Sequence, residues 1–201
     1  MRTVFLILAG AVLGCAQDSR TVAKNLCLEM QRLTAEGDLL AARSLVPTAE
    51  QKIQLLGLAD PNAALLVNQI AILEQVLGDY AKAERIYSSA IQKLETIDPY
   101  GLSAAILLLN LARTHLEAGD GPSDAYGLAQ RALSLATYRF GPDSPMLSMY
   151  YITLGAALQE LGDRKQALYL YELALGLGRD GSELNKYHVA LALQNSICGR
   201  E

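Results

Sequence analysis

The sequence predicts an all-α protein built as an array of antiparallel helix pairs, and two observations support this fold class. Glycine–aspartate pairs recur at spacings of 41, 41 and 43 residues, beginning at Gly37, Gly78, Gly119 and Gly162. The stretches beside these pairs carry apolar residues at helical spacing. Hydrophobic residues make up 51% of the 201 residues, which is enough for a large core. Because glycine favours helix ends over helix interiors, each pair is interpreted as a tight turn between two helices.

Residues 1–16 are predicted to be an export signal. Arg2 supplies a positive start, and the stretch from Val4 to Leu13 is almost purely apolar. A charged start, a short apolar middle and small residues at the end are typical of secretory signals. The apolar stretch is shorter than the ~20 residues that span a bilayer. The alternative is a hydrophobic first helix that packs on the rest of the chain.

Two cleavage sites compete within this segment. Val12-Leu13-Gly14-Cys15 resembles the lipobox of bacterial lipoproteins, in which Cys15 would be acylated and become the first residue. Acyl chains would then tether the protein to a membrane. The small-x-small pattern of Gly14-Cys15-Ala16 allows an ordinary signal peptidase to cut after Ala16 instead. The expected location is therefore a periplasmic or membrane-anchored lipoprotein, or alternatively a secreted protein.

The first helix pair is expected over residues 22–58 and is irregular. Leu39, Ala42 and Ala49 fit a helix that follows Gly37, but Pro47 falls inside it. Proline removes a backbone hydrogen bond and clashes with the preceding turn, at a cost of ~3 kcal/mol or more. We therefore expect this second helix to kink or split, and to resume near Ala49.

The second helix pair is expected over residues 62–97 and is regular. After the turn, one helical stripe carries both small and large side chains, namely Tyr80, Ala83, Tyr87, Ala90 and Ile91. The alanines let two helix backbones approach, while the tyrosines fill the wider space between them. Further pairs are expected over 102–138 and 146–178, followed by a capping helix over 183–198. Glu74 occupies a position that suits an aromatic residue, so its carboxylate is expected to be paired or to reach solvent.

These residues carry a resemblance to the tetratricopeptide repeat. The spacing of Gly78, Tyr80, Ala83, Tyr87 and Ala90 is similar to the second half of that repeat. The same pattern is matched by Gly119, Ala125 and Ala132, by Gly162, Ala167, Tyr171 and Ala174, and in the first-half motif by Leu154 and Gly155. The long unit and the connector from Phe140 to Pro145 resemble the kinesin-light-chain-like subclass. The resemblance implies a right-handed α-solenoid over residues 17–198.

The resemblance also implies that the first helix of each pair lines an inner groove. The predicted groove residues are Asn68, Gln69, Ile72, Ile106, Leu109, Asn110, Arg113, Ile152 and Thr153. Amides can bond the backbone of an extended peptide, and aliphatic groups offer apolar contact. Arg113 is the one cation in this set. The alternative is a groove filled by the terminal helix or by a neighbouring copy, so the sequence leaves self-association open.

The composition excludes several classes of function. Lysine and arginine total 17 against 21 aspartates and glutamates, without a basic run, so nucleic-acid binding is not expected. Two histidines and three cysteines are too few for a typical multi-ligand metal site. The chain has no phosphate-binding glycine loop, nucleophile elbow or zinc-protease motif, so no catalytic residue and no cofactor are predicted.

The expected function is therefore a non-catalytic scaffold or adaptor of the bacterial cell envelope. It would bind a peptide or helix segment of a protein partner in the groove, with membrane contact through a lipid on Cys15. The alternative is an accessory or regulatory subunit that positions an envelope enzyme complex.

Overall fold

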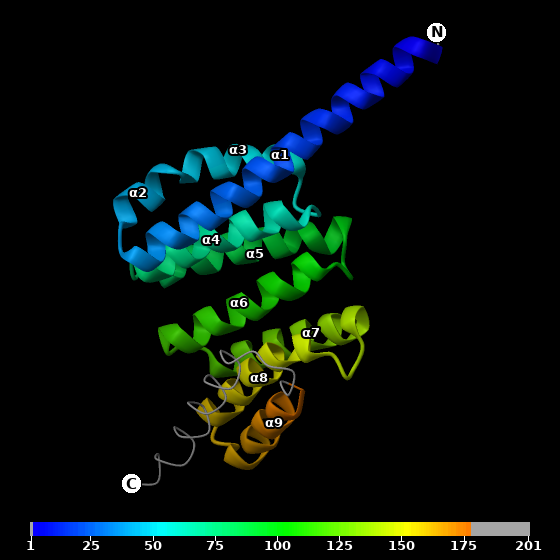
Figure 1. Cartoon of the computed structure of the whole chain (residues 1–201). Coiled ribbons are helices and arrows are strands. Elements are labelled where there is room, and N and C mark those ends of the chain that lie inside the picture. The colour runs from blue at the N-terminus through cyan, green and yellow to red at the C-terminus, as the bar shows by residue number, and fades with distance from the viewer. Residues whose placement is uncertain (1, 178–201) are drawn as a thin grey trace. The chain divides into compact units, whose positions relative to one another are not determined.

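The computed structural model describes residues 2–177, with side chains described from residue 18 onward. This part of the chain is helical, without a β-strand. It forms two compact units, an N-terminal unit that ends at Ile97 and a C-terminal unit that begins at Asp98 (Figure 1). The predicted cap over 183–198 lies outside the described residues. The predicted all-α class, built from helix pairs, is thus the fold that forms.

The N-terminal unit consists of a long first helix, a split second helix and a regular helix pair. Its elements are α1 (Arg2–Glu36), α2 (Leu39–Ser44), α3 (Val46–Leu56), α4 (Pro61–Val76) and α5 (Tyr80–Ile97). The split falls where Pro47 predicted it, because α2 ends at Ser44 and Pro47 lies in the first turn of α3. Proline is tolerated there, since the first amides of a helix have no partner within the helix.

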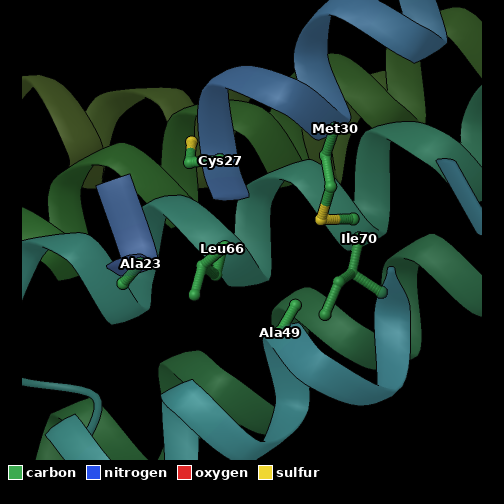
Figure 2. Close-up of a cluster of buried hydrophobic side chains, with 6 residues drawn as sticks. All are labelled: Ala23, Cys27, Met30, Ala49, Leu66 and Ile70. Atoms are coloured by element: carbon green, nitrogen blue, oxygen red, sulfur yellow. The ribbon is translucent and has the colours of Figure 1, made fainter. Parts of the chain in front are cut away.

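The core of this unit lies between α1, α3 and α4. Its buried side chains are Ala23, Cys27, Met30, Ala49, Leu66 and Ile70 (Figure 2). Ala23 and Ala49 are fully buried, and small side chains at these positions let α1 and α3 approach α4. Burial also raises the pKa of the Cys27 thiol, which favours its unreactive protonated form.

An ion pair joins the N-terminus of α4 to α1. Arg20 Nε of α1 lies 2.7 Å from Oδ2 of Asp60, and Oδ1 of Asp60 caps α4 by accepting a hydrogen bond from the Asn62 backbone amide at 2.9 Å. Burial by itself would raise the pKa of Asp60, but the hydrogen bonds from Arg20 and Asn62 outweigh it and lower the pKa. None of the described helices is both long and apolar enough to cross a membrane.

The C-terminal unit contains two complete helix pairs. Its elements are α6 (Leu102–Ala118), α7 (Pro122–Phe140), the 3-10 helix η1 (Pro145–Leu147), α8 (Ser148–Glu160) and α9 (Arg164–Leu177). Helix α6 packs on α7, α7 on α8, and α8 on α9. Buried alanines from α6, α7 and α8 form one small core with Leu154. Tyr171, Ala167 and Ala174 of α9 form another core with Leu158 of α8.

Each repeated glycine ends a helix in the left-handed conformation. The φ angles of Gly37, Gly78, Gly119 and Gly162 lie between 73° and 87°. At every one of these turns the glycine amide donates to the carbonyl three residues back, and the following aspartate amide donates to the carbonyl five residues back. These two bonds satisfy helix-terminal carbonyls that would otherwise lack partners. A residue with a Cβ atom would strain this backbone.

The aspartate of each pair then starts the next helix. Oδ1 of Asp38, Asp79 and Asp163 accepts a hydrogen bond from the backbone amide three residues later, at 2.9–3.1 Å. Asp120 is the exception, because the extra residue Gly121 caps α7 without a side-chain bond. Asp120 lies 3.4 Å from Nδ1 of His115 instead. The Gly-Asp pair is therefore both a stop signal and a start signal at three of the four turns.

Asp79→Ala is expected to lower the free energy of unfolding by about 0.5–2 kcal/mol, because the Lys82 amide loses its cap. Asp120→Ala is the matched control and should change it by less than about 0.5 kcal/mol, since Asp120 caps no helix amide. Thermal unfolding followed by circular dichroism measures both. Equal losses in the two variants would contradict the capping role.

The residues predicted to pack the repeats are mostly buried. Tyr80 is half-buried, whereas the other predicted residues of the helix interiors are buried, namely Ala83, Tyr87, Ala90, Ala125, Ala132, Leu154, Gly155, Ala167, Tyr171 and Ala174. Gly155 of α8 faces the ring of Tyr171 in α9, and a Cβ atom at Gly155 would lie 2.6 Å from that ring. The α8–α9 pair is thus closed by a glycine on one helix and a tyrosine on the other.

Candidate functional site

The predicted groove residues of α4 contribute mainly to the interior of the N-terminal unit. Asn68 and Gln69 are 9% and 8% exposed, and Ile72 is half-buried. Oδ1 of Asn68 accepts a hydrogen bond from the hydroxyl of Tyr87 in α5, at 2.8 Å. The Asn68 side chain therefore joins the two helices of the pair, and it is not displayed for a partner.

The predicted residues of α6 differ in their exposure. Leu109 is 7% exposed, so it belongs to the core, while Ile106 and Asn110 are half-buried. Asn110 donates its side-chain amide to the carbonyl of Ile106 in its own helix, at 3.1 Å. Arg113 is exposed and lies 3.7 Å from Glu117, one turn later. Of the four groove residues predicted on α6, Arg113 is therefore the most exposed.

Helix α8 places its predicted residues beside Arg113. Ile152 is half-buried, and the buried hydroxyl of Thr153 donates to the carbonyl of Met149 at 3.0 Å. A hollow of about 150 Å³ lies between α6 and α8, lined by Arg113, Leu116, Glu117, Ile152, Thr153 and Ala156. We call it the first-helix hollow. Three predicted groove residues, Arg113, Ile152 and Thr153, thus meet at one place.

The first-helix hollow combines an apolar base with charged groups at its edge. Leu116, Ile152 and Ala156 supply apolar surface, and all three are half-buried. The Arg113–Glu117 pair is about half exposed, so its interaction is screened by water and exchanges readily for bonds to a partner. Such an arrangement suits the binding of a side chain and its neighbouring backbone.

Two buried tyrosines have shifted pKa values that their packing explains. Tyr150 and Tyr171 have pKa values raised to about 12, chiefly because both are buried. The hydroxyl of Tyr171 donates to Gln159 at 3.2 Å, as expected for a packed tyrosine. Within residues 2–177, no three histidine, cysteine, aspartate or glutamate side chains are grouped so that they could hold a metal ion.

A larger pocket of about 560 Å³ lies in the N-terminal unit, on the side of the second helices α3 and α5. This pocket is not among the sites predicted from the sequence. Glu74, which lines it, is paired, in line with expectation: its Oε1 lies 2.6 Å from Nζ of Lys82. The spacing of Lys82, Arg85 and Lys93 on one face of α5 is the signal that could have indicated this pocket.

Solved structures share this fold over most of the chain. A TPR-like repeat protein of Podosopora anserina, described as a candidate kinesin light chain, has a TM-score of 0.67 at 16% identity, covering 90% of this chain and 89% of its own. A single-substitution variant of it has a TM-score of 0.68 at 15% identity, with the same coverage. BtubC (BKLC) from P. vanneervenii has a TM-score of 0.64 at 21% identity, covering 92% and 84%. No protein-family model and no curated protein matches the chain. The fold of the chain is therefore a TPR-like array of helix pairs.

Proposed function

We propose that this protein is a non-catalytic interaction module that binds a peptide or helical segment of a partner protein. The observation that carries the proposal is the first-helix hollow, where three residues predicted to bind a partner meet. The solved TPR-like structures that share the fold of this chain are in keeping with a protein-binding scaffold. The partner would place an apolar side chain against Ile152 and Ala156.

Binding in this hollow would use two kinds of contact. The apolar contact with Ile152, Leu116 and Ala156 would supply most of the affinity, because burying apolar surface contributes ~25 cal/mol per Å². Arg113 and Glu117 would set orientation, since charges at an edge contribute more to specificity than to affinity. Asn68 and Leu109 take no part in this proposal because both are buried.

The test compares two arginine substitutions in affinity capture from an envelope extract. Ala156→Arg fills the first-helix hollow with a long side chain, while Ala81→Arg adds the same side chain at an exposed position of α5. We expect Ala156→Arg to reduce the captured partner at least about tenfold and Ala81→Arg to leave it unchanged. Circular dichroism checks that both variants fold. Equal capture by the unsubstituted protein and both variants would show that the partner binds outside the first-helix hollow. If the captured partner is an enzyme, the result would favour the alternative of an accessory subunit.

We also propose that the protein acts in a bacterial envelope, either as a lipoprotein acylated at Cys15 or after cleavage behind Ala16. The signal-like composition of residues 1–16 supports this. The mass of the protein recovered from its host distinguishes the two forms. An uncut, unmodified chain would favour the alternative, a hydrophobic first helix that packs on the rest of the chain.

A further inference from the structure

The pocket of the N-terminal unit is large enough to bind a ligand. Its volume of about 560 Å³ falls in the usual range for binding pockets. Helices α3, α4 and α5 and the turn at Gly57 and Leu58 line it, and these helices can be followed in Figure 1. We call it the second-helix pocket, because its two walls come from α3 and α5. It lies within one compact unit, so a single body supplies all of its residues.

The base of the second-helix pocket is apolar. Val67 and Ile70 of α4 are buried, and so is Ala90 of α5. Val46 and Ile53 of α3 lie seven residues apart, which puts them two turns apart on one helix face. Ile86 of α5 completes this surface. An occupant would therefore need an apolar stripe to exclude water from the base.

The wall formed by α5 carries three cations along its length. Lys82, Arg85 and Lys93 lie at relative positions 0, 3 and 11, so they follow one face over about 16 Å. Lys82 is neutralised by the buried carboxylate of Glu74, at 2.6 Å. Arg85 and Lys93 are exposed, and neither has a carboxylate partner within residues 18–177.

The wall formed by α3 has the opposite character. Its polar pocket residues are Glu50 and Gln54, both exposed. A negatively charged group in the pocket would be repelled by Glu50 and attracted by Arg85 and Lys93. The two walls would thus orient an amphipathic occupant, with its acidic side against α5 and its apolar side on the base.

We propose that the second-helix pocket binds an acidic amphipathic helix of a partner protein. About three turns of helix match the 16 Å of charged wall. Two carboxylates seven or eight residues apart would face Arg85 and Lys93, which are themselves eight residues apart. The second-helix pocket is formed by α3, α4 and α5, and the first-helix hollow by α6 and α8, so the two sites share no residue and this proposal does not depend on the proposed function.

The first experiment uses two labelled synthetic peptides and the whole protein. One peptide of about fourteen residues has leucines at helical spacing and glutamates along one side, and the other has lysines in place of the glutamates. Fluorescence anisotropy measures both affinities. The acidic peptide should bind at least about tenfold more tightly, and its binding should weaken as salt is added. No binding of the acidic peptide, or equal binding of the two, would overturn the proposal.

The second experiment locates the peptide with matched variants. Arg85→Glu combined with Lys93→Glu should weaken the acidic peptide at least about tenfold, whereas Arg139→Glu with Lys165→Glu makes the same charge change at exposed positions of α7 and α9 and should have little effect. Ser89→Trp should block the pocket, whereas Ser88→Trp adds the same ring to an exposed residue outside the pocket lining. Equal effects within either matched set would overturn the assignment. Ala156→Arg should leave this binding unchanged, which keeps the two sites separable.

Discussion

Gly155→Ala is expected to lower the free energy of unfolding by about 1–3 kcal/mol, although alanine is the better helix former. The added Cβ would lie 2.6 Å from Cε1 and 2.9 Å from Cδ1 of Tyr171. The tyrosine is 1% exposed and its hydroxyl donates to Gln159, so the ring has no open space into which it can turn. Either α8 and α9 must separate or the ring must leave its place in the core.

Gly127→Ala is the matched control for this prediction. Gly127 also lies inside a helix, and nothing lies within 4 Å of the position that its Cβ would take. Here the substitution should raise the free energy of unfolding by about 0.5–1 kcal/mol, through helix propensity alone. Urea denaturation of both variants measures the difference. If Gly155→Ala also raises the free energy of unfolding, then α8 does not pack as closely against Tyr171 as described.

Tyr87→Phe is expected to lower the free energy of unfolding by about 1–3 kcal/mol. The substitution keeps the ring but removes the hydroxyl that donates to Oδ1 of Asn68 at 2.8 Å. Tyr87 is fully buried and Asn68 nearly so, so water cannot easily replace the lost donor. Tyr138→Phe is the control. Its side chain is 78% exposed, and the expected change is below about 0.5 kcal/mol.

A double-mutant cycle separates this hydrogen bond from other effects of the substitutions. Asn68→Ala, Tyr87→Phe and the combined variant are unfolded in urea under the same conditions. If the two groups act as a pair, the combined loss should be smaller than the sum of the single losses by about 0.5–3 kcal/mol. If the two single losses add up to the combined loss, the hydrogen bond between Tyr87 and Asn68 contributes little to stability.

The elements of the fold could be predicted because their signals are local. A glycine that stops one helix and an aspartate that starts the next are adjacent in the sequence, and Pro47 marks its own break. The turn at Asp120 shows the limit of this approach. One inserted residue, Gly121, takes over the capping position, so the same dipeptide has a different role.

The candidate site was harder to predict because it depends on depth and on contacts between distant residues. Helical spacing puts Asn68 and Leu109 on a particular helix face, but it does not say how deeply a neighbouring helix covers that face. Both residues proved to be buried, whereas Arg113 remained exposed. The second-helix pocket is lined by α3 and α5, which are separated by 23 residues of sequence, so no single stretch of sequence carries its signal.

At the glycine–aspartate turns, hydrogen bonds end one helix and begin the next, and this has a consequence for how the chain folds. At Gly78 and Asp79 these bonds join residues no more than five positions apart. A hairpin whose turn is encoded so locally incurs little loop-closure entropy, and proteins rich in such short-range contacts fold quickly. It follows that the α4–α5 hairpin could form during synthesis, before the residues of α6 have left the ribosome. The arrangement also suits growth of the gene by duplication, since a copied segment of about forty residues would carry both of its own boundary signals.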